Sequence, residues 1–135
     1  MEQQIKKQRA EFEYPPELTF SVSGRYFDDI ATGVKKFEGR GKDSRLLKTT
    51  KATDIIKIVH PETNRYFLAW RGSAFAHNSI EEMLLCAKHP ISVMLPGTES
   101  IAEGVQLYQK MCPEMCTGIV YAIEILPCSR VYPTK

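Results

Sequence analysis

The sequence lacks the features that mark several large classes of protein. None of its apolar runs approaches the ~20 residues that a membrane-spanning helix needs. Its first residues, MEQQIKKQRAEFEYPPE, are polar and contain no apolar core like that of a secretory signal. No glycine-rich phosphate loop follows an expected strand, and there is no internal repeat. We therefore expect a cytoplasmic or nuclear protein that is not secreted, has no membrane partner and is not a doubly wound nucleotide-binding domain.

Residues that commonly ligate metals are few and scattered. The chain has four cysteines, and its three histidines stand singly at His60, His77 and His89. Cys112 and Cys116 form a C-x3-C pair, CPEMC, but no histidine lies near it in the sequence. A structural zinc site usually needs four ligands in tight pairs. We expect the cysteines to be reduced, partly buried thiols, and we predict neither a metal nor any other cofactor.

Length and composition indicate one ordinary globular domain. The chain has 135 residues, 43% apolar and 25% charged, which is enough for a core without covalent staples. Residues 1–14 alternate charged and amide side chains with little apolar content, and Pro15 and Pro16 end any helix there. We predict a flexible N-terminal arm over residues 1–16 and a single domain over 17–135.

Hydrophobic periodicity predicts short strands mixed with helices. The strand candidates are LTFSV (18–22), VKKFEGR (34–40), DIIKIV (54–59), RYFLAWRG (65–72) and GIVYAIEIL (118–126). A helix is expected over 24–32, with Ser23 as its cap and Gly33 as its stop. Two more helices are expected after the capping boxes that Ser79 and Ser100 open. This order predicts an α+β fold built on a small curled sheet or barrel.

Positive charge is concentrated in one part of the chain. The stretch GVKKFEGRGKDSRLLKTTK (33–51) contains seven basic and two acidic residues, a local charge of +5, whereas the whole chain carries +2. Such a field attracts polyanions. Taken singly, the loop side chains Lys42, Arg45, Lys48 and Lys51 are more typical of a solvated rim than of specific contacts.

Four residues within this stretch carry a resemblance to a known family. Gly33, Lys35, Glu38 and Arg40 spell G-x-K-x-x-E-x-R, which resembles the signature of the ASCH domain, a PUA-like β-barrel family. SGRYFDDIATGVKKFEGR is similar to the strand, short helix and motif with which the family opens, and KATDIIKI and GIVYAIEI resemble its later strands. The resemblance implies a fold of the α+β class, a PUA-like small curled β-barrel with flanking helices.

The resemblance also implies a function connected with RNA. PUA-like domains bind RNA, and ASCH domains are proposed to bind RNA or to act on it. The family's ligand cleft is lined by its motif residues, which correspond here to Lys35, Glu38 and Arg40. We predict an RNA-binding or single-stranded nucleic-acid-binding domain with a basic cleft around this motif. The other predicted contacts are Lys42, Arg45, Lys48 and Arg71.

Three alternatives to plain binding remain open. In family members that deacetylate 4-acetylcytidine, the reaction is associated with an arrangement of one lysine, one threonine and one glutamate. Here Glu38 takes the threonine position and Gly97 the glutamate position, with Glu99 two residues further on, which disfavours this reaction. A metal-independent ribonuclease needs a base, an acid and a cation. Lys35, Glu38 and Arg40 are candidates, with Lys35 and Glu38 as the catalytic residues, and a tyrosine not identified further could also contribute. The third alternative is a protein-interaction module.

Strand parity makes two predictions about side-chain direction. On a regular strand Lys35 lies on the opposite face from Glu38, whereas Arg40 shares the face of Glu38 and can pair with it. Tyr66 and Trp70 share one face of a later strand, where an aromatic ring could stack on a base. We expect Trp70, however, to belong to the core or to its edge.

Overall fold

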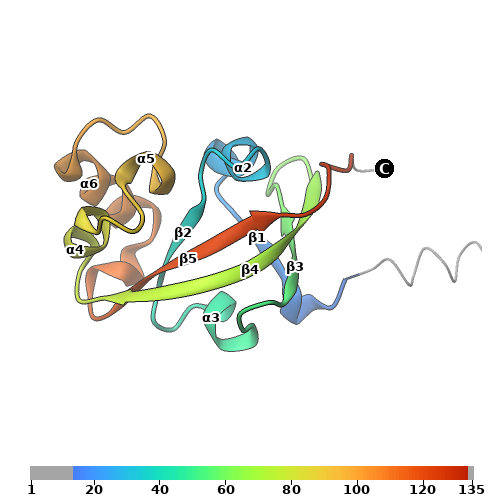
Figure 1. Cartoon of the computed structure of the whole chain (residues 1–135), viewed down its shortest axis with the longest axis horizontal. Coiled ribbons are helices and arrows are strands. Elements are labelled where there is room, and N and C mark those ends of the chain that lie inside the picture. Colours follow the sequence, from blue (N-terminus) through green and yellow to red (C-terminus); the bar gives the residue numbers. More distant parts are fainter. Residues whose placement is uncertain (1–13, 134–135) are drawn as a thin grey trace, which may run out of the picture.

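The computed structural model describes residues 14–133, which form one curled sheet with helices around it (Figure 1). Most of the predicted N-terminal arm, residues 1–13, lies outside this range. The elements are η1 (Pro16–Leu18), β1 (Thr19–Ser21), α2 (Gly24–Ala31), β2 (Phe37–Gly41), α3 (Arg45–Thr49), β3 (Ile55–Val59), β4 (Tyr66–His77), α4 (Ile80–Leu85), α5 (Ile91–Met94), α6 (Ile101–Met111), η2 (Pro113–Cys116) and β5 (Val120–Pro127). The predicted order is confirmed, with α3 and α5 added to it.

The sheet has five strands in the order β1-β3-β4-β5-β2. β1 and β3 are parallel, and the other neighbours are antiparallel. The long strand β4 pairs with both β3 and β5, and a register shift between Arg71 and Ala74 marks an irregularity that bends it. The curl brings the two edge strands close enough for Arg40 of β2 to donate to the carbonyl of Ser21 in β1, at 3.0 Å. The predicted α+β fold, a small curled sheet with flanking helices, is confirmed, and the five strands form a half-barrel.

The core lies on one face of the sheet. Ile56 of β3 and Phe67 and Ala69 of β4 have no measurable exposure, and Phe27 of α2 packs edge-on against Phe67 with ring centroids 5.2 Å apart. Trp70 lies on the opposite face of β4 and is 43% exposed. The prediction that Trp70 belongs to the core or to its edge is therefore wrong. Phe67 and Ala69 are buried, and Trp70, which follows Ala69, points to the other face of the strand.

Helix α2 forms where the apolar pattern predicts it. Tyr26, Phe27 and Ile30 are buried against the sheet. Gly33 follows the helix with φ +80°, a left-handed conformation that glycine adopts readily. Ser23 precedes the helix, but its side chain makes no capping hydrogen bond.

The later helices gather at one end of the sheet (Figure 1). Both predicted capping serines are confirmed, since Ser79 Oγ accepts from the Glu82 amide and Ser100 Oγ accepts from the Glu103 amide, each at 3.1 Å. Within residues 14–133 no helix is both long and apolar enough to cross a membrane.

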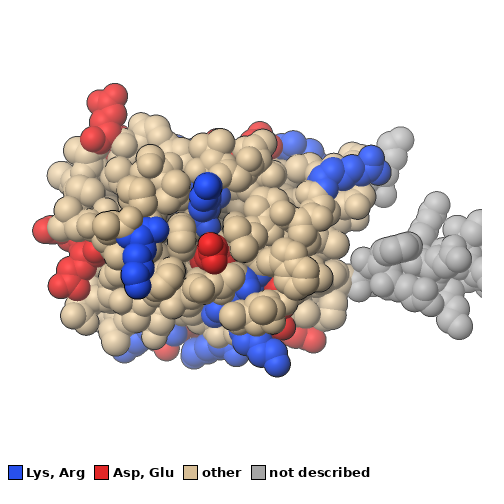
Figure 2. Space-filling model, viewed as in Figure 1, with Lys and Arg blue, Asp and Glu red and all other residues tan. Residues whose placement is uncertain are grey.

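Charged side chains are spread over the surface in both signs. On the face in Figure 2, basic groups are separated by acidic groups and by uncharged surface. Lys48 lies 3.7 Å from the Asp43 carboxylate, and both side chains are well exposed. Among the described residues, no single unbroken basic patch covers the face shown in Figure 2.

Candidate ligand pocket

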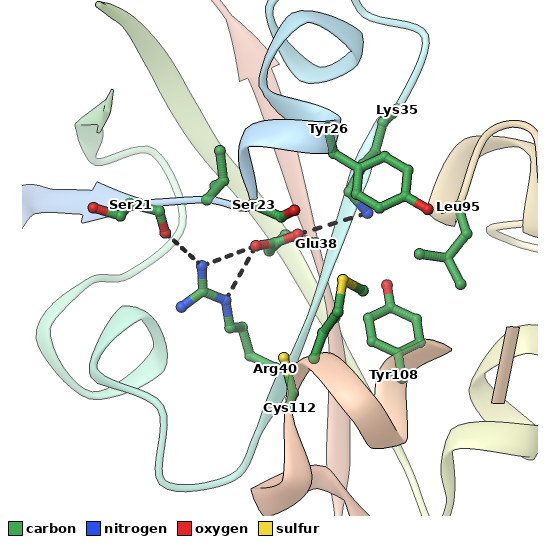
Figure 3. Close-up of a pocket in the computed structure, with 12 residues that line it drawn as sticks. Ser21, Ser23, Tyr26, Lys35, Glu38, Arg40, Leu95, Tyr108 and Cys112 are labelled. Atoms are coloured by element: carbon green, nitrogen blue, oxygen red, sulfur yellow. Dashed lines mark hydrogen bonds and ion pairs between the residues drawn. The ribbon is translucent and has the colours of Figure 1, made fainter. Parts of the chain in front are cut away.

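A pocket of about 350 Å³ lies between β1, the start of α2, β2 and the end of α6 (Figure 3). It is lined by all three residues predicted as the centre of the cleft, Lys35, Glu38 and Arg40. Two tyrosines, Tyr26 and Tyr108, also line it. The pocket thus joins the motif to two aromatic residues that are far apart in the sequence.

Lys35 lies at the base of this pocket and is 1% exposed. Its ammonium group donates to the Phe37 carbonyl at 2.6 Å and to the Met94 carbonyl, and it lies 3.6 Å from Glu38 Oε1. The prediction that Lys35 and Glu38 lie on opposite faces is wrong, because β2 begins only at Phe37 and Lys35 precedes the regular strand. Burial lowers the pKa of Lys35, and the charge of Glu38 offsets this only in part.

Glu38 lies between two cations. Its Oε2 accepts from Arg40 Nη2 at 2.8 Å and from Arg40 Nε at 3.3 Å, while Oε1 faces Lys35 (Figure 3). Burial alone would raise the pKa of Glu38, but the charges of Arg40 and Lys35 outweigh it and hold that pKa below its usual value. Glu38 is therefore an ionised carboxylate that fixes both cations.

This arrangement predicts a specific dependence of stability on pH. Because folding lowers the pKa of Glu38, its contribution is fully present above its unfolded pKa of ~4.3 and is lost as the pH falls through the folded value. The difference in unfolding free energy between the wild type and Glu38→Gln should therefore narrow as the pH falls below about 4. Urea unfolding at a series of pH values measures it, and a constant difference would contradict the prediction.

The partners of Arg40 hold its guanidinium in place but do not occupy all of its hydrogen-bond donors. Nη2 bridges Glu38 and the Ser21 carbonyl, and the side chain retains 22% exposure. Within residues 14–133 no acceptor binds Nη1. Arg40 therefore offers two N–H donors at the pocket, held in place by the bonds of its other nitrogens.

Two tyrosine hydroxyls in the pocket have no partner. Tyr26 and Tyr108 are each 2% exposed, and nothing in the described part of the chain hydrogen-bonds to either hydroxyl, although the Gly39 amide lies near that of Tyr108. Figure 3 shows the Tyr108 hydroxyl turned toward Tyr26. Burial, and then the charge of Glu38, raise the pKa of Tyr108 well above its usual value, so it remains a donor. Buried hydroxyls without partners are rare, and here they indicate space for a polar ligand.

The sequence did not identify these two tyrosines as site residues. Tyr26 and Tyr108 each fit the apolar face of a helix, which is sufficient reason for either to be buried. The available signal is the hydroxyl itself, because a purely structural position would accept phenylalanine and a buried tyrosine normally has a hydrogen-bond partner.

The other predicted contacts do not line the pocket. Arg45 donates to the carbonyls of Pro16 and Thr19, and its guanidinium lies 4.3 Å from the ring centroid of Phe20, so it fastens the segment before β1 to α3. Arg71 is only 7% exposed and donates to its neighbour's carbonyl in β4 at 2.9 Å.

Two of the predicted lysines remain on the surface. Lys42 lines a separate hollow together with Glu114, and Lys48 pairs with Asp43. The motif residues therefore come together as predicted, while the loop residues surround or support the site rather than form it.

The comparisons with known proteins agree with this architecture. Hypothetical protein PH0355 is 32% identical to the chain, with a TM-score of 0.63, over 82% of this chain and 97% of that protein. PF0455 from Pyrococcus furiosus is 29% identical, with a TM-score of 0.59, over 81% of this chain and 94% of its own. The chain belongs to the family of PH0355. No family model matches the sequence, and neither does any curated protein.

Two mutants of ZmASCH from Zymomonas mobilis share the fold at much lower identity. They are 12% and 15% identical to the chain, each with a TM-score of 0.59, over 87% and 90% of this chain and 73% and 77% of theirs. The chain has an ASCH-like fold. The resemblance expected from the G-x-K-x-x-E-x-R motif is thereby confirmed, and at this identity the likeness to ZmASCH concerns the fold alone.

Proposed function

We propose that this ASCH-like domain binds RNA or other single-stranded nucleic acid, with one nucleotide entering the pocket at Arg40. The observation that carries the proposal is the state of Arg40, which is held by Glu38 and by the Ser21 carbonyl yet keeps Nη1 unpaired at a pocket. A guanidinium positioned in this way suits a phosphate or a base carbonyl, since both offer oxygen acceptors to the N–H groups of Nη1.

The remainder of the pocket supports a nucleotide as the ligand. Lys35, Glu38 and Arg40 together carry a charge of +1, which suits one phosphate. The hydroxyls of Tyr26 and Tyr108 can donate to base or sugar oxygens. A volume of about 350 Å³ admits a single nucleotide rather than a duplex. A base can enter only after it leaves its stack, which favours single strands.

The same geometry favours binding over catalysis. A general base needs a pKa near the working pH, whereas the pKa of Glu38 is lowered and both of its oxygens face cations. Lys35 already faces three oxygen acceptors. Glu99 does not line the pocket, so the amidohydrolase alternative gains no support either.

Binding is expected to be weak, selective for single strands and strongly dependent on salt. Displacement of counterions from phosphates by basic side chains makes affinity fall as salt rises, so RNA should bind more tightly at about 50 mM than at about 200 mM. Filter binding with short RNA, single-stranded DNA and duplex DNA measures this, with a gel to detect cleavage. Absence of binding at low salt would contradict the proposal and favour the protein-interaction module. Cleaved RNA without added metal would instead favour the ribonuclease.

Variants of Arg40 assign this binding to the pocket. Arg40→Ala should lose ~1–3 kcal/mol of binding free energy, the range for a charge-assisted contact. Arg40→Lys keeps the charge but loses the fixed guanidinium that presents Nη1 to the pocket, so it should restore little of the affinity. Lys48→Ala is the matched control, because Lys48 is exposed and lies outside the pocket, and it should cost a small amount that disappears at higher salt.

A further inference from the structure

Three residues that are separated in the sequence meet at the end of β4. His77 is the last residue of β4, Cys86 follows α4, and His89 precedes α5. The Nε2 atoms of the two histidines are 2.9 Å apart. One ring nitrogen of each histidine and the Cys86 sulfur lie within 4.8 Å of one another. The prediction that the histidines stand singly is wrong for this pair, because α4 turns the chain back toward β4.

We propose that His77, Cys86 and His89 form a binding site for Zn²⁺. Two imidazoles and one thiolate are nitrogen and sulfur donors, which zinc prefers, whereas Mg²⁺ and Ca²⁺ prefer oxygen. Cys112 and Cys116, the pair that stood out in the sequence, take no part in this cluster.

The spacing of the three donors suits a tetrahedral ion. Zn–N bonds of about 2.0–2.1 Å and a Zn–S bond of about 2.3 Å separate two nitrogens by about 3.3 Å and a nitrogen from sulfur by about 3.6 Å. The observed separation of the two Nε2 atoms, 2.9 Å, is somewhat shorter than the first value, and all three donors lie within 4.8 Å of one another. His77 and Cys86 are less buried than His89, so their side chains can rotate to adjust these distances. His77 and Cys86 are only half-buried, which leaves a fourth position open to water.

A hydrogen bond between the two histidines accounts for only part of this arrangement. Such a bond uses only the two Nε2 atoms. It also gives no reason for Cys86 to lie beside the pair. His89 itself is completely buried, with its ring centroid 5.2 Å from that of Phe37 and 6.0 Å from that of Phe75, so its position is fixed. A bound metal would use all three side chains, which already lie close together before it binds.

A metal at this site would support the pocket without entering it. The site connects β4 to the segment that leads into α5, and α5 supplies the Met94 carbonyl that Lys35 binds. The Val93 carbonyl of the same helix accepts from the Lys36 amide at 2.8 Å. None of the three donors lines the pocket. The expected role is therefore to hold the α4–α5 segment against the sheet.

The test uses the full chain without a histidine tag, in a non-thiol reductant, titrated with Co²⁺ as a spectroscopic probe. One equivalent should produce the visible absorption of tetrahedral Co²⁺ together with a thiolate-to-cobalt charge-transfer band, and Zn²⁺ should displace both. Zn²⁺ at about 100 times its Kd should also raise the melting temperature by about 5–10 °C. Absence of the charge-transfer band with the wild type would overturn the proposal.

Matched variants identify the ligands. Cys86→Ser should abolish the charge-transfer band, and His77→Ala should weaken Co²⁺ binding at least tenfold. Neither residue is deeply buried, so both variants should fold, as circular dichroism without metal would show. Cys116→Ser and Cys128→Ser change exposed thiols and should leave the spectrum unaltered. A band that survives in Cys86→Ser but is lost in Cys116→Ser would overturn the proposal and assign the metal to the CPEMC pair.

Discussion

Glu38→Gln is expected to lower the free energy of unfolding by about 3–5 kcal/mol, the cost of removing one partner from a buried ion pair. The substitution preserves the shape of the side chain but leaves the ammonium of Lys35, which is 1% exposed, without its counter-charge. It also replaces one carboxylate oxygen by an amide NH2 group, so position 38 can no longer present an acceptor both to Lys35 and to Arg40 Nε and Nη2. Urea unfolding at neutral pH measures the loss.

The exposed ion pair of Lys48 and Asp43 provides the control. Asp43→Asn makes the same chemical change where both side chains are mostly exposed, so it should cost no more than ~1 kcal/mol. The double variant Lys35→Met with Glu38→Gln removes both buried charges and should recover part of the stability. If Glu38→Gln were as stable as Asp43→Asn, the ion pair would have no structural role.

Whether Glu38→Gln weakens or strengthens RNA binding distinguishes an organised pocket from an unorganised basic surface. An unorganised basic surface would bind polyanions more tightly after losing a negative charge. A pocket in which Glu38 positions Arg40 should bind RNA less tightly, despite the increase in positive charge. RNA binding of the two proteins is compared without denaturant, at a temperature where the variant remains folded. Tighter binding by Glu38→Gln than by the wild type would contradict the positioning role of Glu38.

Gly39→Ala is expected to destabilise the protein by about 1–3 kcal/mol and to weaken RNA binding at the same time. A Cβ on Gly39 would lie 2.8 Å from three atoms of the Tyr108 ring and hydroxyl, closer than any ordinary contact. Tyr108 is buried, so the ring cannot simply turn into solvent. Its displacement should move the hydroxyl within the pocket. Thermal unfolding and filter binding measure the two effects.

Gly41→Ala is the matched control for this substitution. Gly41 lies two residues further along β2, on the same side of the strand, and a Cβ there would come no closer than 3.4 Å to Glu114. Such distances are ordinary van der Waals contacts, so Gly41→Ala should be close to neutral. Equal losses from the two variants would mean that β2 tolerates no side chain at either glycine, and the contact with Tyr108 would not explain the effect.

The sequence predicted the features that depend on local patterns. The capping boxes at Ser79 and Ser100 place α4 and α6 correctly because a cap acts within one turn of its own helix. Gly33 ends α2 as expected, through a positive φ. The motif residues Glu38 and Arg40 share one face of β2, as strand parity requires.

The features that failed depend on contacts between distant segments. Trp70 obeys parity, but parity cannot say which face of β4 the helices cover. Lys35 turns inward because α5, 59 residues later in the chain, supplies a carbonyl for it. Arg71 has the same charge as Arg40, yet it is buried beside a bend in β4. Such contacts become visible only when the sheet order is known.

The bond between Arg40 and Ser21 has a consequence for motion. β1 and β2 are the two edges of the sheet, and at the pocket the contact between them is a side chain bonded to a carbonyl rather than a backbone ladder. Separating these edges locally breaks one hydrogen bond and leaves every strand pair intact, so it costs far less than unfolding a strand. We therefore expect the gap between β1 and β2 to widen without unfolding, so that amides elsewhere in the sheet exchange slowly while a ligand enters quickly between these two strands.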